Sequence, residues 1–118
     1  MDTEQNLQYE LNSEPLRIGE WTFYHDLFKI ERADKEVKLE PRSAQLLMYL
    51  VQNPGKTCSR ETLIENAWPN MVVGDEVLTS AINKLRKAFE DSSQNPQYLE
   101  TIPKAGYRLI APVQVIPA

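Results

Sequence analysis

Residues 75–89 carry the most informative pattern in the chain, because they alternate at helical spacing between one apolar and one polar face. At 100° per residue, the apolar side chains Leu78, Ala81, Ile82, Leu85 and Phe89 fall on one side of the expected helix. The opposite side carries Glu76, Ser80, Asn83, Lys84 and Lys87. Asp75 is expected to cap this helix. The apolar face must pack on other elements, whereas the polar face is left to solvent or to a ligand.

Two shorter helices are expected before this segment. Pro41 opens the first, since a proline at the first helical position loses no hydrogen bond, and Asn53-Pro54-Gly55 ends it. Ser59 is expected to cap the second, which Pro69 ends. Each has an apolar stripe, made by Ala44, Leu47 and Val51 in the first and by Leu63, Ile64, Ala67 and Trp68 in the second. The three segments together predict a three-helix core.

Short strands are expected on both sides of the helices. Residues 16–23 alternate as one half-buried strand, residues 27–31 and 36–39 continue the pattern, and residues 33–35 form a turn. This predicts an N-terminal antiparallel sheet of three or four strands. Residues 98–102 and 107–110 predict a hairpin around a turn at 103–106. The fold class is therefore α+β, with one domain at residues 15–116 and a flexible tail at residues 1–14.

The composition excludes several kinds of site. One cysteine, Cys58, and one histidine, His25, cannot make a disulfide or a zinc site, so no metal is expected. The four glycines lie too far apart for a phosphate loop, and no cofactor is expected. A catalytic pair of Cys58 and His25 lacks an orienting partner, so the chain is not expected to be an enzyme. No apolar run approaches the roughly 20 residues that span a bilayer.

The net charge of −4 by itself argues against binding to nucleic acid, but the charge is unevenly distributed along the chain. Residues 1–40 hold ten acidic and five basic residues, whereas residues 41–118 hold seven acidic and eight basic residues. Between Val77 and Phe89 there are three bases, Lys84, Arg86 and Lys87, and no acid. A local basic face can bind phosphate even on an acidic domain.

The polar face of the 75–89 helix also carries side chains that suit DNA. Asn83 can pair with adenine through two hydrogen bonds, and Thr79 and Ser80 can reach base edges or phosphates. Lys84 and Lys87 supply positive charge. An ordinary solvated helix face has a similar composition, so this spacing alone leaves both interpretations open.

Several motifs in sequence order resemble the OmpR/PhoB-type winged helix-turn-helix. They are Ser59-Arg60-Glu61-x-Leu63-Ile64-x-x-x-Trp68, then Leu85-Arg86-Lys87, then Thr101-Ile102-Pro103-Lys104-Ala105-Gly106-Tyr107-Arg108-Leu109. The resemblance spans residues 16–115, and the Ile-Pro-Lys-x-Gly-Tyr turn is most similar to the CadC/ToxR group of membrane-anchored transcription regulators. It implies sequence-specific binding of double-stranded DNA by the cytoplasmic domain of a bacterial inner-membrane regulator.

The resemblance also implies roles by position. Residues 75–89 would be the recognition helix in the major groove, and residues 101–109 would be the wing, on phosphate or the minor groove. The implied DNA-binding residues are Arg60, Trp68, Thr79, Ser80, Asn83, Lys84, Lys87, Lys104, Tyr107 and Arg108, with pairing to a nearby acid as the alternative for Arg108. Glu76 and Ala105 depart from the family pattern, because relatives usually carry basic side chains at these two positions. These departures affect the affinity for DNA more than the fold.

Further partners follow from the same resemblance. Residues 69–74 would be the loop that contacts RNA polymerase in some relatives, and self-association is expected mainly on DNA. The membrane would be reached only through a segment outside this chain. Hydrophobic Met71-Val72-Val73 supports an alternative function, a winged helix that serves as a protein–protein interaction module.

Overall fold

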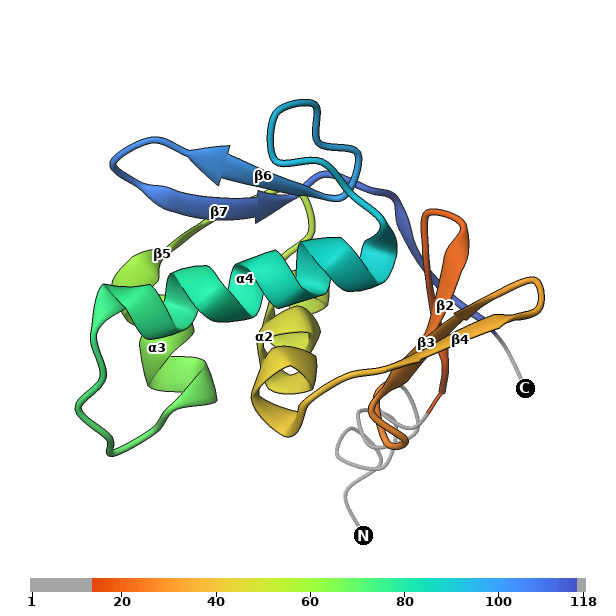
Figure 1. Ribbon diagram of the computed structural model, residues 1–118, viewed down its shortest axis with the longest axis horizontal. Coiled ribbons are helices and arrows are strands. Elements are labelled where there is room, and N and C mark those ends of the chain that lie inside the picture. The colour runs from red at the N-terminus through yellow and green to blue at the C-terminus, as the bar shows by residue number, and fades with distance from the viewer. Residues whose placement is uncertain (1–13, 117–118) are drawn as a thin grey trace, which may run out of the picture.

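The computed structural model describes residues 14–116, so the tail predicted at residues 1–14 lies almost wholly outside the described residues. Within this part of the chain three helices separate two groups of strands (Figure 1). The elements are β1 (Leu16–Ile18), β2 (Trp21–Tyr24), β3 (Lys29–Arg32), β4 (Lys35–Lys38), α2 (Pro41–Gln52), β5 (Thr57–Ser59), α3 (Arg60–Ala67), α4 (Asp75–Phe89), β6 (Leu99–Ile102), β7 (Gly106–Leu109) and β8 (Val113–Val115). The predicted order of sheet, three helices and hairpin is therefore present.

The first sheet contains five antiparallel strands in the order β4-β3-β2-β1-β8. The expectation of one continuous strand over residues 16–23 was wrong, because Gly19 and Glu20 form a turn that separates β1 from β2. Gly19 has a φ of +58°, which glycine adopts without steric cost, and its N–H donates to the carbonyl of Pro112 at 2.9 Å. Strand β8, which no sequence pattern indicated, pairs with β1 and completes the sheet.

The second sheet contains three strands in the order β5-β7-β6. The β6–β7 hairpin was predicted, and the short strand β5 was not. Cys58 on β5 lies opposite Tyr107 on β7, so the segment that enters α3 is hydrogen-bonded to the hairpin. The wing, residues 101–109, is thereby attached to the start of α3 as well as to α4.

The helix termini largely follow the sequence. Pro41 is at the start of α2, and the hydroxyl of Ser59 accepts a hydrogen bond from the backbone N–H of Thr62 at 3.1 Å, as its capping role requires. The cap predicted at Asp75 was wrong. Gly74 is the N-cap of α4, and Asp75 is the first helical residue, where its negative charge suits the positive end of the helix dipole.

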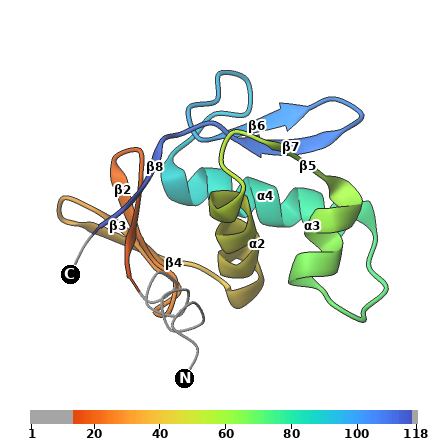
Figure 2. The same cartoon turned by 180° about the vertical axis from the view of Figure 1, so that it is seen from behind.

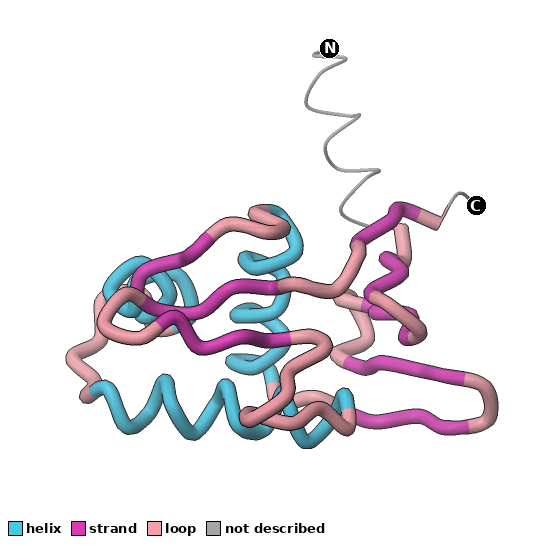
Figure 3. Tube along the Cα trace, turned by 90° about the horizontal axis from the view of Figure 1, so that it is seen from above, coloured by secondary structure: helices cyan, strands magenta, loops and turns pink. Residues whose placement is uncertain are grey.

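The three helices lie together on one side of the three-stranded sheet (Figure 1). The five-stranded sheet lies at one end of the molecule beside α2, and α3 lies at the other end (Figures 1 and 2). Viewed from above, α4 runs along one flank with the three-stranded sheet beside it (Figure 3). One flank of α4 is therefore left uncovered by other elements.

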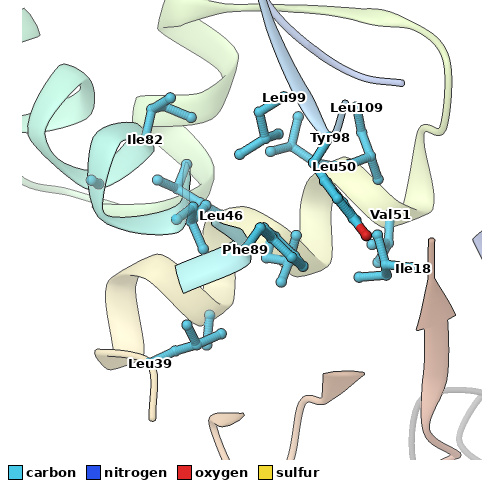
Figure 4. Packing of buried hydrophobic residues seen from close by; sticks show 14 of the residues in the cluster. Ile18, Leu39, Leu46, Leu50, Val51, Ile82, Phe89, Tyr98, Leu99 and Leu109 are labelled. Carbon is cyan, nitrogen blue, oxygen red and sulfur yellow. The ribbon is translucent and has the colours of Figure 1, made fainter. Parts of the chain in front are cut away.

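Phe89 joins these parts at the end of α4 (Figure 4). Its ring stacks on Tyr98, with centroids 4.8 Å apart and planes inclined by 8°, and meets the Trp21 ring edge-on at 6.2 Å. All three side chains are buried. One aromatic cluster thus connects α4, the base of the wing and the first sheet.

Candidate nucleic-acid interface

The polar face of α4 is exposed and forms a shallow open groove. The side chains that line this groove are Glu76, Thr79, Ser80, Asn83, Lys84 and Lys87, and all six are exposed. The five apolar side chains predicted on the other face are all buried. Periodicity alone therefore assigned both faces of α4 correctly, and the surface carries hydroxyls, an amide and ammonium groups in one row.

Arg86 does not belong to this face, which corrects the sequence interpretation of three bases on one surface. Its side chain is only 6% exposed. The guanidinium donates to the carbonyl of Leu99 from Nε at 3.2 Å and from Nη2 at 3.0 Å, and Nη2 also donates to Thr101 Oγ1 at 2.7 Å. Arg86 therefore fixes β6 against α4, and the basic groups left on the polar face are Lys84 and Lys87.

Arg60 bridges three elements at one end of α4. Its Nη1 donates to the hydroxyl of Tyr107 at 2.9 Å, and its Nη2 donates to the carbonyl of Asp75 at 3.1 Å and to Thr79 Oγ1 at 3.0 Å. Its side chain remains 30% exposed, whereas Tyr107 is only 3% exposed. The guanidinium is thus held in one position beside the polar face of α4, with Tyr107 beneath it.

Trp68 ends α3 and is 7% exposed, as its apolar pattern indicated. It lines a hollow between the start of α2 and the polar face of α4, together with Glu40, Ser80 and Lys84. Arg42 secures this corner, because its Nη1 donates to the carbonyl of Ala67 at 2.6 Å. Nothing in the local sequence pattern around Arg42 indicates this contact, which joins residues 25 positions apart.

The wing carries two basic candidate residues, Lys104 and Arg108, and their surroundings differ. Lys104 is exposed at its tip and has a φ of +65°, a left-handed conformation that costs free energy for a residue with a side chain. Arg108 instead pairs with Glu100 on the neighbouring strand, with Nη2 2.6 Å from Oε1. The acid-pair alternative given for Arg108 is therefore present in the structure.

Asp91 holds the base of the wing, and sequence reasoning missed it. Its Oδ1 accepts from the N–H of Gln97 at 2.7 Å, and its Oδ2 accepts from those of Tyr98 and Leu99 at 3.1 and 3.0 Å. Three donors on one carboxylate make a rigid loop, because hydrogen bonds to a charged acceptor are strong. The orientation of the wing relative to α4 therefore rests on Asp91 and Arg86.

Cys58 is buried between the sheet and the helices, as its interpretation as a small apolar residue required. Burial raises the pKa of its thiol above the ordinary value, which disfavours the thiolate. Cys58 lies on β5 of the second sheet, whereas His25 lies in the turn that follows β2 of the first sheet. The pair that a thiol catalyst would need is not assembled.

A family model described as "Transcriptional regulatory protein, C terminal" matches residues 34–109. The chain is 38% identical to the transcriptional activator CadC of Escherichia coli over 99 residues, which cover 83% of this chain and 19% of that protein. It is also 38% identical to the cholera toxin transcriptional activator of Vibrio cholerae over 91 residues, which cover 74% of this chain and 31% of that protein.

A solved structure supports the same relationship. The DNA-binding domain of Escherichia coli CadC superposes with a TM-score of 0.79 at 36% identity, covering 87% of this chain and 97% of that one. The α+β winged helix-turn-helix predicted from sequence, with its N-terminal sheet, three-helix core and hairpin wing, is confirmed, as is the resemblance to the CadC/ToxR group. The chain spans less than a third of the length of these two curated relatives.

Proposed function

The chain belongs to the family of C-terminal domains of transcriptional regulatory proteins, and from that membership we propose that it binds double-stranded DNA sequence-specifically as part of a bacterial transcription regulator. The observation that carries the proposal is the uncovered polar face of α4, with the wing attached to the same helix. In this proposal α4 enters the major groove, and the wing meets phosphate or the minor groove.

The side chains divide by chemistry in this arrangement. Asn83 reads a base edge, Thr79 and Ser80 contact bases or phosphates, and Lys84 and Lys87 meet phosphates. Arg60 and the indole N–H of Trp68 contact phosphates near the start of α4, and Tyr107 contributes by positioning Arg60. Lys104 and Arg108 act from the wing. Electrophoretic mobility shifts at low salt test the proposal, and a folded domain that shifts neither genomic nor random duplexes contradicts it.

Asn83 and Lys87 lie on the same exposed face, but their replacements are expected to act differently. The cognate duplex is one selected in vitro with the parent domain. Asn83→Ala should weaken binding to this duplex by about 1–3 kcal/mol and should change binding to random DNA little, because an amide pairs with one base edge. Lys87→Ala should weaken both duplexes alike and reduce the magnitude of the log-salt slope by about one unit. Titrations at several salt concentrations measure both effects. If both variants bind the cognate duplex as tightly as the parent domain does, α4 does not read DNA.

Lys104 offers a test in which stability and binding change in opposite directions. Lys104→Gly should stabilise the fold by about 0.4–1 kcal/mol, since glycine adopts a φ of +65° without strain. The same change should weaken DNA binding severalfold by removing a phosphate or minor-groove contact. Denaturant unfolding and DNA titration of one preparation check the two effects. If glycine leaves affinity intact, Lys104 is only a turn residue.

The larger regulator is proposed by analogy with its relatives. The domain would be the cytoplasmic part of an inner-membrane protein, reaching the membrane through a segment outside this chain. Among the described residues, no helix has the length and apolar character needed to cross a bilayer. The sequence of the complete gene tests this point. Self-association is proposed to occur on DNA, and a tight dimer in sedimentation without DNA would contradict it.

The loop at residues 69–74 supports a protein contact in addition to DNA. Met71 is 50% exposed, and Val72 is fully exposed between α3 and α4. In a regulator this surface would contact RNA polymerase, and a winged helix that binds only protein remains the alternative function. A Val72→Ser variant that keeps DNA affinity but loses transcription activation supports the polymerase contact. We propose no enzymatic activity, since the relatives are transcription regulators.

A further inference from the structure

Lys84 on the polar face of α4 already holds an anionic partner. Its ammonium lies 3.1 Å from Oε1 and 3.2 Å from Oε2 of Glu40, the residue that precedes α2. Both side chains are more than half exposed, Lys84 at 54% and Glu40 at 65%. The pair therefore lies at the surface that the proposed function places against DNA, and it joins residues 44 positions apart.

A second carboxylate lies near this pair. Glu40 and Glu76 both line the hollow between α2 and α4, with Ser80 and Trp68. Lys87 lies one turn along α4 from Lys84, and it makes no ion pair within residues 14–116. Of the two lysines on the polar face, one is neutralised internally and one is available to a ligand.

We infer that Glu40 competes with DNA phosphate for the ammonium of Lys84 and so lowers the affinity of the domain for DNA of every sequence. This inference rests on the proposed function. An exposed ion pair contributes little and is screened by salt, so a phosphate can displace the carboxylate. The displaced carboxylate then remains beside the phosphate and repels it. Whether Lys84 stays paired or moves, the negative charge at position 40 opposes the DNA backbone.

Such a contact suits a protein that must avoid bulk DNA. Binding to random sequence consists almost wholly of phosphate contacts, and a genome offers a large excess of such sites. A carboxylate that weakens one phosphate contact shortens the time that the domain spends on random-sequence sites. It alters no contact with a base. Glu40 would thus set the strength of binding, while Asn83 sets the sequence.

Replacing Glu40 tests the inference on a random-sequence duplex titrated at several salt concentrations. Glu40→Gln should bind about two- to fivefold more tightly, which lies within the range of an exposed ion pair, and should steepen the log-salt slope by about one unit. Glu40→Ser removes the same charge and supplies a good N-cap for α2, so it secures the test if the glutamine variant folds poorly.

Two controls separate this mechanism from a general change of charge. Glu36→Gln removes another exposed carboxylate, paired with Lys29 at 2.9 Å in the first sheet, and should leave affinity nearly unchanged. In a Lys84→Ala background, Glu40→Gln should have a clearly smaller effect, because no ammonium is released and only the direct repulsion of phosphate is removed.

The remaining outcomes overturn the inference. An equal gain from Glu36→Gln indicates net charge alone, and an undiminished gain without Lys84 indicates that Glu40 acts only by repelling phosphate directly. Weaker binding by Glu40→Gln shows that Glu40 itself contacts DNA favourably. If the parent domain binds no duplex at low salt, the proposed function fails as well, which distinguishes that failure from the other three.

Discussion

A protein carrying Gly106→Ala is expected to lose about 3–5 kcal/mol of its free energy of unfolding, from backbone strain and overpacking together. Gly106 begins β7 with a φ of +155°, opposite Ser59 of β5. A Cβ at this position would lie 1.9 Å from the carbonyl oxygen of Cys58 and 2.9 Å from its carbonyl carbon. Both atoms are backbone, so β5 can yield only by separating from the wing.

Gly55→Ala provides the matched control for this result. Gly55 also has a positive φ, +73°, but an added Cβ would meet no atom within 4 Å. Its alanine variant therefore carries the strain without the clash, and about 1 kcal/mol is expected. Denaturant unfolding, monitored by circular dichroism, measures the loss of stability in both alanine variants. Similar losses in both variants would show that the close approach of β5 and β7 contributes nothing.

Phe89→Ala is the second substitution with a large expected effect, about 3–5 kcal/mol of destabilisation. The ring is 1% exposed, stacks on Tyr98 and meets Trp21 edge-on, so its removal leaves a cavity where three parts of the fold meet. The wing should also lose order at its base, because Tyr98 loses its stacking partner. Denaturant unfolding measures the first effect, and hydrogen exchange of residues 98–109 measures the second.

Phe28→Ala controls for the chemistry of the change. Phe28 is 44% exposed in the turn before β3, so the same truncation should cost less than about 1 kcal/mol. A loss at Phe28 that equals the loss at Phe89 would contradict the role assigned to the aromatic cluster.

Long periodic segments were predictable from the sequence, whereas the three-residue strands β5 and β8 were not. The fifteen residues of α4 contain four turns of pattern, which fixed both of its faces. Strands β5 and β8 have three residues each, too few for a periodicity, and they form through pairing with distant strands. The hairpin at residues 16–24 did leave a signal. Buried Ile18 and Trp21 are three residues apart, which breaks an alternation of two and marks the turn at Gly19.

The candidate site was predictable as a surface but not as a network. Arg86 was placed with the basic residues by its charge, although it lies four residues after Ile82 and three before Phe89, on the apolar side. Its spacing therefore indicated burial. The contacts of Arg60 with Tyr107 and of Lys84 with Glu40 join residues 47 and 44 positions apart. Such contacts depend on the packed fold, and no local pattern encodes them.

The pairing of β1 with β8 has a consequence for the order of events during synthesis. Leu16 pairs with Val115, so β1 must wait for a partner strand that is synthesised almost a whole domain later. Until residues 113–115 emerge, β1 in the nascent chain keeps a row of backbone donors and acceptors without partners on that side. Distant pairing of this kind closes a large loop and is slow. The helices and the wing can assemble earlier, and the first sheet is the part of the nascent domain exposed longest to mispairing with a neighbouring chain.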